Sequence, residues 1–137
     1  MIRIETPDFM SAADTAHEDR AFTVFSVRGN LTVDRVPAVE TFFLRAIASG
    51  RRDFVLDGDG LTYVSSTGFG LLLHVCNLLR DRGGDLKLAN LSPAVGRSLR
   101  LLSLSRYLDV WPKTQDALCA FERAVARFQP STAALAA

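Results

Sequence analysis

Short apolar runs alternate with segments of helical spacing along most of this 137-residue chain. Such alternation predicts an α/β fold, because each crossover helix returns the chain to a neighbouring parallel strand. We expect helices to begin at Asp34, Thr67, Ser92 and Thr114. The expected strands span residues 1–4, 22–27, 54–56, 86–89 and 108–111, with a further short apolar run at 61–64. The pattern therefore predicts a mixed, mostly parallel sheet of four to five strands packed with about four helices.

The length and composition fit one domain, which we expect to span residues 1–128. Hydrophobic residues make up 48% and charged residues 23%, which is a globular balance. Residues 6–20 are polar and lack periodic apolar positions, so we expect a flexible connection there. No helix separates the first two expected strands, and they should therefore pair antiparallel. The small residues of segment 129–137 predict a frayed tail.

Composition argues against several classes of function. The formal net charge of +1 offers no surplus of cations for nucleic acid. No apolar run approaches the roughly 20 residues that membrane insertion requires. Cys76 and Cys119 are too few for a secreted disulfide framework, so we expect reduced thiols and a cytoplasmic protein.

Isolated polar residues give no catalytic set. His74 and Cys76 are two positions apart on one expected helix, so their side chains point to different sides and cannot share a metal. Asp57 and Asp59 flank glycines, which is typical of a turn. No glycine-rich loop matches a phosphate-binding fingerprint. We therefore expect no metal, no cofactor and no enzymatic activity.

Three consecutive hydroxyl residues, Ser65, Ser66 and Thr67, lie between an apolar run and an apolar helix. One interpretation is N-capping, in which a hydroxyl accepts hydrogen bonds from the first free N–H groups of the helix. Capping needs only one hydroxyl, however. A hydroxyl at a helix start can also accept a phosphoryl group, whose charge of about −1.5 to −2 the positive helix end tolerates.

The segment 54–73 that contains these hydroxyls resembles the signature of STAS domains, which are the anti-sigma factor antagonists and their relatives. The signature is an apolar strand ending in Asp, a turn, a second short apolar run, then Asp-Ser-Ser-Gly-Leu-Gly and an apolar helix. Here Asp57 ends the strand, and residues 65–70 read Ser-Ser-Thr-Gly-Phe-Gly. The likeness covers residues 22–125 and includes the segments 29–32, 83–86 and 91–95. It implies a single STAS-like domain.

The resemblance implies a partner-switching protein. An antagonist of this family binds an anti-sigma factor that is also a serine kinase, and a metal-dependent serine phosphatase reverses the phosphorylation. By position, Ser66 matches the phosphoacceptor, with Ser65 and Thr67 as second choices. The residues expected to bind the partner are Asn30, Leu31, Thr32, Ser65, Ser66, Thr67, Gly68 and Phe69.

Two alternatives stay open. Ser65 stands where the family has Asp, and this departure favours a second interpretation. In that interpretation the chain is a non-switching adaptor, either a subunit of a lipid-transport ABC complex or a scaffold in a stress-signalling assembly.

The expected helix that follows the three hydroxyl residues has a second apolar stripe, formed by Leu71, Val75 and Leu78. This stripe either meets a partner or is covered by flanking helices.

Overall fold

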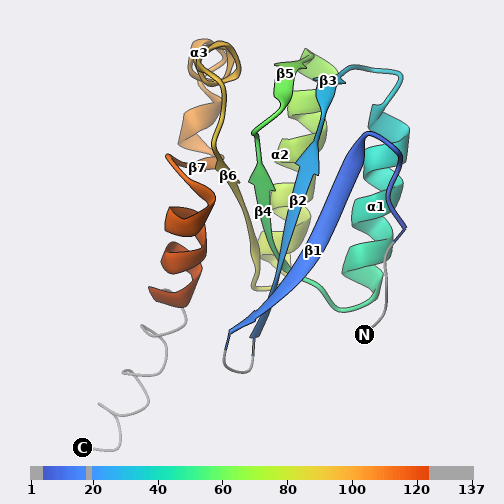
Figure 1. Cartoon of the computed structure of the whole chain (residues 1–137), viewed down its shortest axis with the longest axis vertical. Coiled ribbons are helices and arrows are strands. Elements are labelled where there is room, and N and C mark those ends of the chain that lie inside the picture. Colours follow the sequence, from blue (N-terminus) through green and yellow to red (C-terminus); the bar gives the residue numbers. More distant parts are fainter. Residues whose placement is uncertain (1–4, 18–19, 124–137) are drawn as a thin grey trace, which may run out of the picture.

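The main sheet consists of β1 (Met10–His17), β2 (Arg20–Val27), β4 (Asp53–Asp57), β6 (Asp85–Ala89) and β7 (Asp109–Trp111). The structure is a computed structural model that describes residues 5–17 and 20–123. The strands lie in the order β1-β2-β4-β6-β7 (Figure 1). β1 runs antiparallel to β2, and the other neighbours are parallel. This arrangement confirms the predicted mixed, mostly parallel α/β fold.

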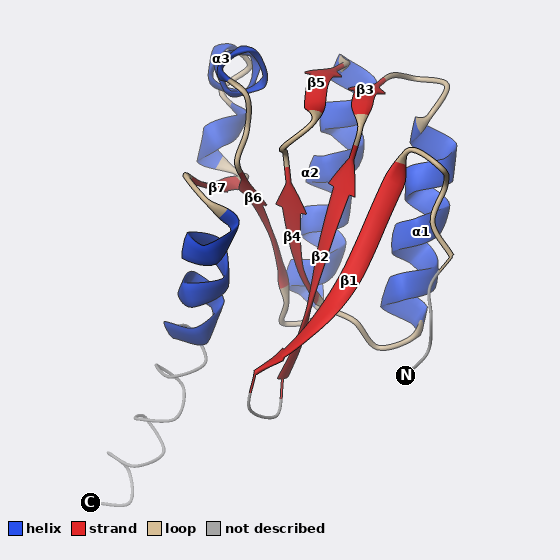
Figure 2. Cartoon of the chain, viewed as in Figure 1, coloured by secondary structure: helices blue, strands red, loops and turns tan. Residues whose placement is uncertain are grey.

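Helices lie on both faces of the sheet (Figure 2). α1 (Val36–Ala48) and α2 (Ser66–Asp81) cover one face. The chain continues through α3 (Pro93–Leu101) and the short 3-10 helix η1 (Leu104–Arg106). A C-terminal helix, described over residues 114–123, packs on the opposite face. There Phe121 contacts Phe22 with ring centroids 5.4 Å apart. All four expected helices are thus present, although Arg35, not Asp34, precedes the first turn of α1.

The prediction of a flexible connection over residues 6–20 was wrong in its central part. β1 pairs with β2 residue by residue, from Met10 opposite Val27 to His17 opposite Arg20. Most β1 side chains are small or polar, so the segment lacks the apolar alternation that reveals a strand in sequence. The strand expected over 1–4 and the tail expected over 129–137 lie outside the described residues.

A second, two-stranded sheet carries the chain from the main sheet to the start of α2. It pairs β3 (Gly29–Leu31) in parallel with β5 (Leu61–Val64). Gly29 opens β3 with a φ of 80°. Its N–H donates to the carbonyl of Gly60 at 2.8 Å. The extension brings the end of β3 beside the N-terminus of α2, which sets up the candidate site.

Both apolar stripes of α2 are covered. Leu71 and Val75, from the second stripe, are 5% and 1% exposed, and Leu78 is half-buried. The first stripe, formed by Phe69, Leu72, Leu73, Cys76 and Leu79, lies in the same core as four other phenylalanines. Of these, Phe25 and Phe43 meet edge to face at 4.9 Å. Of the two alternatives for the second stripe, coverage by neighbouring elements is therefore correct. A partner surface has to be sought elsewhere.

Candidate functional site

The three consecutive hydroxyl residues divide their roles at the start of α2. Ser65 is the N-cap, with extended backbone, and its Oγ accepts a hydrogen bond from the N–H of Gly68 at 3.1 Å. Its carbonyl accepts from the N–H of Phe69 at 2.9 Å. Ser66 and Thr67 are the first two helical residues, and both are exposed. Capping therefore occupies the hydroxyl of Ser65 and leaves those of Ser66 and Thr67 facing solvent.

Gly68 allows α2 to begin directly against β3. A Cβ atom at this position would lie 2.9 Å from the carbonyl oxygen of Leu31 and 2.9 Å from Cγ1 of Val64. The N–H of Ser65 also donates to the carbonyl of Leu31 at 3.0 Å. The end of β3 and the first turn of α2 are thus held together as one unit, which fixes the backbone under Ser66.

Polar side chains from β3 and β5 border this unit. Asn30 is exposed and Thr32 is half-buried. Asn30 Oδ1 accepts a hydrogen bond from Thr62 Oγ1 at 2.7 Å, and the same hydroxyl lies 3.0 Å from the carbonyl of Gly29. The hydroxyl of Thr32 donates to the Asp34 carboxylate. These contacts give the neighbours of Ser66 defined orientations.

The residues expected to bind a partner therefore fall into two layers. Asn30, Thr32, Ser66 and Thr67 reach the surface, and Ser65 is partly exposed. Leu31 and Phe69 are 0% and 2% exposed, so their side chains support the site from within the core. Gly68 is buried as well. Only the side chains of the surface layer can contact a partner directly.

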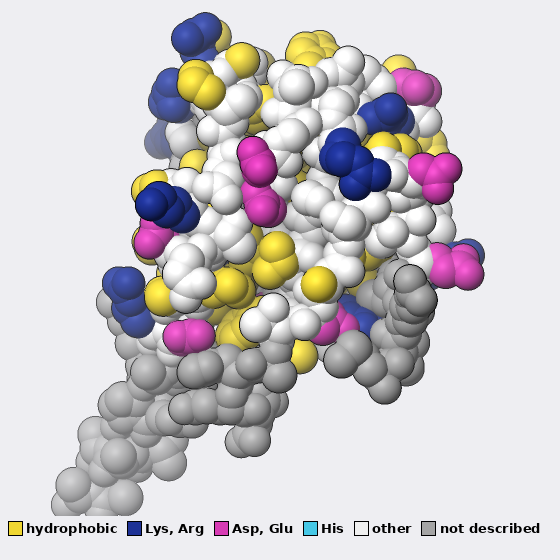
Figure 3. Space-filling model, viewed as in Figure 1, with side chains coloured by type: hydrophobic (Ala, Val, Ile, Leu, Met, Phe, Trp, Pro, Cys, Tyr) yellow, Lys and Arg dark blue, Asp and Glu magenta, His cyan; other side chains and the backbone are white. Residues whose placement is uncertain are grey.

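Two exposed apolar residues near this surface were not anticipated. Tyr63 lies opposite Asn30 in the β3–β5 pair and is 53% exposed. Val33 follows Thr32 and is 64% exposed. Their exposure depends on how β3, β5 and α1 pack, and periodicity alone carries no signal for it. Figure 3 shows how hydrophobic and charged groups are distributed over one face of the whole molecule.

The charges around the site are few. α2 has no acidic residue in its first turn. The hydrogen bond that Thr32 donates to Asp34 lowers the pKa of this exposed carboxyl below its usual value. The Arg35 guanidinium donates to the carbonyls of Arg28 and Asn30 at 2.9 and 3.1 Å and stacks on Phe9. The free N–H groups and positive end of α2 are therefore the local feature that favours an added negative charge.

No cluster of three or more metal-ligating side chains occurs among residues 5–17 and 20–123. No helix within those ranges is long and apolar enough to span a bilayer.

The chain is similar in sequence and in fold to known proteins. A family model described as STAS domain matches residues 12–117. The anti-sigma-B factor antagonist of Staphylococcus aureus (strain NCTC 8325 / PS 47) is 27% identical over 97 residues, which cover 71% of this chain and 89% of that protein.

Two solved structures share the fold. An anti-sigma factor antagonist from Mycobacterium paratuberculosis superposes with a TM-score of 0.68 and 24% identity, covering 84% of this chain and 96% of the other. The Bacillus cell fate determinant SpoIIAA in its phosphorylated form superposes with a TM-score of 0.60 and 19% identity, covering 81% of this chain and 99% of the other.

Proposed function

The chain belongs to the STAS domain family, and from this membership we propose that it is an anti-sigma factor antagonist controlled by phosphorylation of Ser66. The observation that carries the proposal is the position of Ser66, exposed in the first turn of α2 beside the end of β3. Its partner is an anti-sigma factor with serine kinase activity, and a metal-dependent serine phosphatase restores the free hydroxyl. The protein acts in the cytoplasm and by binding, not by catalysis.

Phosphorylation at Ser66 changes the surface more than the fold. Phosphate adds about −1.5 to −2 charges and three strong acceptors. The free N–H groups and positive end of α2 tolerate that charge, so the domain stays folded. A partner that closed over the uncharged hydroxyl would instead have to bury an unpaired phosphate, at a cost of several kcal/mol.

The partner surface combines polar groups with two apolar anchors. Asn30 and Thr32 flank Leu31, whose carbonyl contacts the start of α2, and Thr67 follows Ser66. Tyr63 and Val33 add exposed apolar area. Tyrosine is frequent among the residues that dominate binding energy at protein interfaces. A surface of this kind suits a reversible protein contact.

A non-switching adaptor is the second candidate. The specific observation in its favour is Ser65, which occupies the place of the family's Asp and whose hydroxyl caps α2. A kinase that recognises the missing carboxylate would then not modify Ser66. The adaptor would bind its partner through the same surface without a switch, as a subunit of a lipid-transport complex or as a stress-signalling scaffold.

Direct phosphorylation separates the two candidates. We would incubate the purified protein with a serine-kinase anti-sigma factor from the same organism and ATP, map the phosphate, and measure kinase binding before and after. We expect phosphate on Ser66, with binding weakened by more than about tenfold, or about 1.4 kcal/mol. Ser66→Ala should remain bound, and Ser65→Asp, which keeps a capping oxygen and restores the family's charge, should speed the modification.

The matched control is Ser105→Asp, because Ser105 is an exposed serine on η1, which packs against α3 and β7. It should bind the kinase like the unmodified protein. Phosphate on Ser65 or Thr67 with Ser66 unmodified would disprove the acceptor assignment. Equal binding of phosphorylated and unphosphorylated protein would favour the adaptor.

A further inference from the structure

The two edges of the main sheet differ in length. β7 is three residues long, and a short edge strand gives another chain little to pair with. β1 is eight residues long and pairs with β2 on one side only. Among the described residues, the outer side of β1 is engaged only at Met10, whose N–H donates to the Pro7 carbonyl at 2.9 Å and whose carbonyl accepts from Thr6 Oγ1 at 3.4 Å.

The register identifies the backbone groups that point outward. Arg28 N–H donates to the Phe9 carbonyl at 2.8 Å, one residue before β1 begins. Residues of an antiparallel ladder alternate between bonded and non-bonded pairs. Residues 11, 13, 15 and 17 therefore bond to β2, and Ala12, Asp14 and Ala16 direct their N–H and C=O groups away from the sheet. Six main-chain groups are thus available to a further strand, besides those of Met10.

The side chains of β1 do little to prevent such pairing. Ser11, Ala12, Ala13 and Thr15 are all exposed, and all are small. Natural edges are usually protected by lysine, proline, bulges or inward-pointing charges. The described part of β1 has no lysine or proline, and its register with β2 is continuous. Its acidic side chain, Asp14, is held by Arg51 at 2.6 Å and by Thr23 at 2.7 Å.

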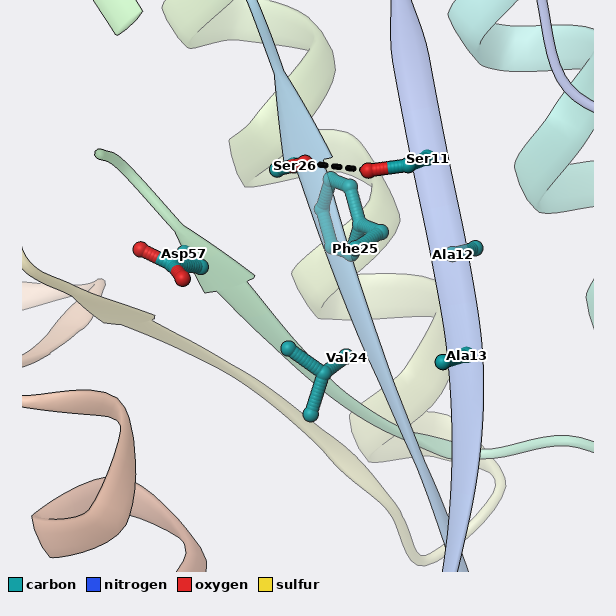
Figure 4. Close-up of a pocket in the computed structure, with 7 residues that line it drawn as sticks. All are labelled: Ser11, Ala12, Ala13, Val24, Phe25, Ser26 and Asp57. Carbon is teal, nitrogen blue, oxygen red and sulfur yellow. Dashed lines mark hydrogen bonds between the residues drawn. The ribbon is translucent and has the colours of Figure 1, made fainter. Parts of the chain in front are cut away.

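The hairpin is hollowed where β1 meets β2. Ser11 Oγ and Ser26 Oγ lie 2.6 Å apart, and Ala13 and Val24 sit farther along the two strands (Figure 4). Asp57 on β4 borders the same hollow, whose volume is about 240 Å³. Small side chains along this edge leave room for a second strand to approach closely.

We propose that β1 is a self-association surface at which a second copy of this chain pairs antiparallel, with the two-fold axis beside Ala13. In this register Ala12 of each copy pairs with Asp14 of the other, and the four main-chain groups of these two residues are all used in each copy. Ser11 then faces the other copy's Thr15, which allows a pair of hydroxyl hydrogen bonds. The two sheets join into one continuous sheet.

Neighbouring registers are less favourable. A two-fold axis beside Ala12 would place Asp14 opposite Met10, whose backbone is already engaged by Pro7 and Thr6, and would leave only Ala12 free to pair. The axis beside Ala13 places Ala16 opposite Met10 and leaves both Ala12 and Asp14 free to pair. An axis beside Asp14 would place two carboxylates opposite each other, which is destabilising. Of the axes beside Ala12, Ala13 and Asp14, the one beside Ala13 pairs Ala12 with Asp14 twice without opposing like charges. This self-complementarity is the reason for naming a second copy as the occupant.

Sedimentation velocity of the full chain over a concentration range tests the proposal. We expect reversible dimerisation, which Ala13→Lys should weaken by about tenfold or more, because it places two cations face to face across the axis. The control is Ala48→Lys, an equally exposed alanine on α1, which should dimerise like the parent protein. Thermal unfolding of both variants verifies that they are folded.

Crosslinking tests the register. In a Cys119→Ser background, Ala13→Cys should form an intermolecular disulfide on mild oxidation, because directly opposed residues of a non-bonded pair lie close enough to bridge. Ala48→Cys should not. A chain that stays monomeric at every concentration, or a dimer insensitive to Ala13→Lys, would overturn the proposal. So would slow amide exchange of Ala12 and Asp14 in the monomer, since the edge would then be covered within one chain.

Discussion

Gly68 and Gly70 lie two residues apart near the start of α2, yet their surroundings differ. A Cβ atom at position 68 would meet the Leu31 carbonyl at 2.9 Å, and that carbonyl is fixed by its bond from Ser65 N–H. A Cβ atom at position 70 has no atom within 4 Å. Glycine is therefore needed at position 68 for the close approach of α2 to β3. At position 70 glycine contributes only the entropic cost of a glycine within a helix.

We expect opposite effects from the two alanine substitutions. Gly68→Ala should lower the free energy of unfolding by about 1–3 kcal/mol, because the added methyl group pushes α2 away from β3. Gly70→Ala should raise it by up to about 1 kcal/mol through higher helix propensity. Urea unfolding followed by circular dichroism measures both. A similar change of the same sign in both variants would show that the contact with Leu31 does not control the packing of this turn.

The sequence located the hydroxyl residues but did not assign their separate roles. Three hydroxyls before an apolar helix were enough to predict a helix start, and the family resemblance selected Ser66. Only the backbone course decided that Ser65 caps the helix and that Ser66 and Thr67 face solvent. Tyr63 and Val33 became candidates in the same way, since their exposure follows from packing and not from spacing.

Among the elements, strands and helices with apolar periodicity were predictable and β1 was not. The helix start at Ser92 was correct, and its hydroxyl accepts from Val95 N–H at 3.2 Å. β1 instead depends on β2, whose aromatic and β-branched residues provide a template that the sequence of β1 does not reveal. A local sequence pattern reveals a strand that buries its own apolar side chains. It does not reveal a strand such as β1, which forms because a neighbouring strand pairs with it.

The attachment of β1 to the rest of the domain should depend on pH. The hydrogen bonds from Arg51 lower the pKa of the partly buried Asp14 carboxyl below its usual value of 3.8. A lowered folded-state pKa stabilises the protein above the unfolded-state pKa, and this stabilisation is lost as pH falls through the folded-state value. We expect the free energy of unfolding of the parent chain to fall more steeply below about pH 4 than that of Asp14→Asn.

Urea titrations at several pH values provide the measurement. Asp34→Asn is a suitable comparison, because the Asp34 carboxyl also has a lowered pKa but is exposed and forms no ion pair with another element in the described part of the chain. Parallel pH profiles for the parent chain and Asp14→Asn would show that the ion pair to Arg51 does not stabilise the hairpin.

At the scale of the whole molecule, the sheet separates two apolar cores. The larger one joins the sheet to α1 and α2, and the smaller one joins it to the C-terminal helix through Phe22, Val55 and Phe121. The two cysteines lie on opposite sides of this division. Cys76 belongs to the larger core on α2, and Cys119 is half-buried on the C-terminal helix. The sheet between them prevents a disulfide without unfolding, and both thiols are free.

This arrangement makes Cys76 a probe of global unfolding. Burial raises the pKa of its thiol to about 11, with the neighbouring Asp85 carboxylate adding to the shift. Both the thiolate fraction and access are therefore low in the folded protein. We expect a thiol reagent at about pH 8 to label Cys119 early and Cys76 only at the rate of global opening. In Cys119→Ser, Cys76 labelling should accelerate with urea along the same slope as unfolding of the entire domain. Labelling of Cys76 that was faster than amide exchange in β4 would mean that α2 opens separately from the sheet.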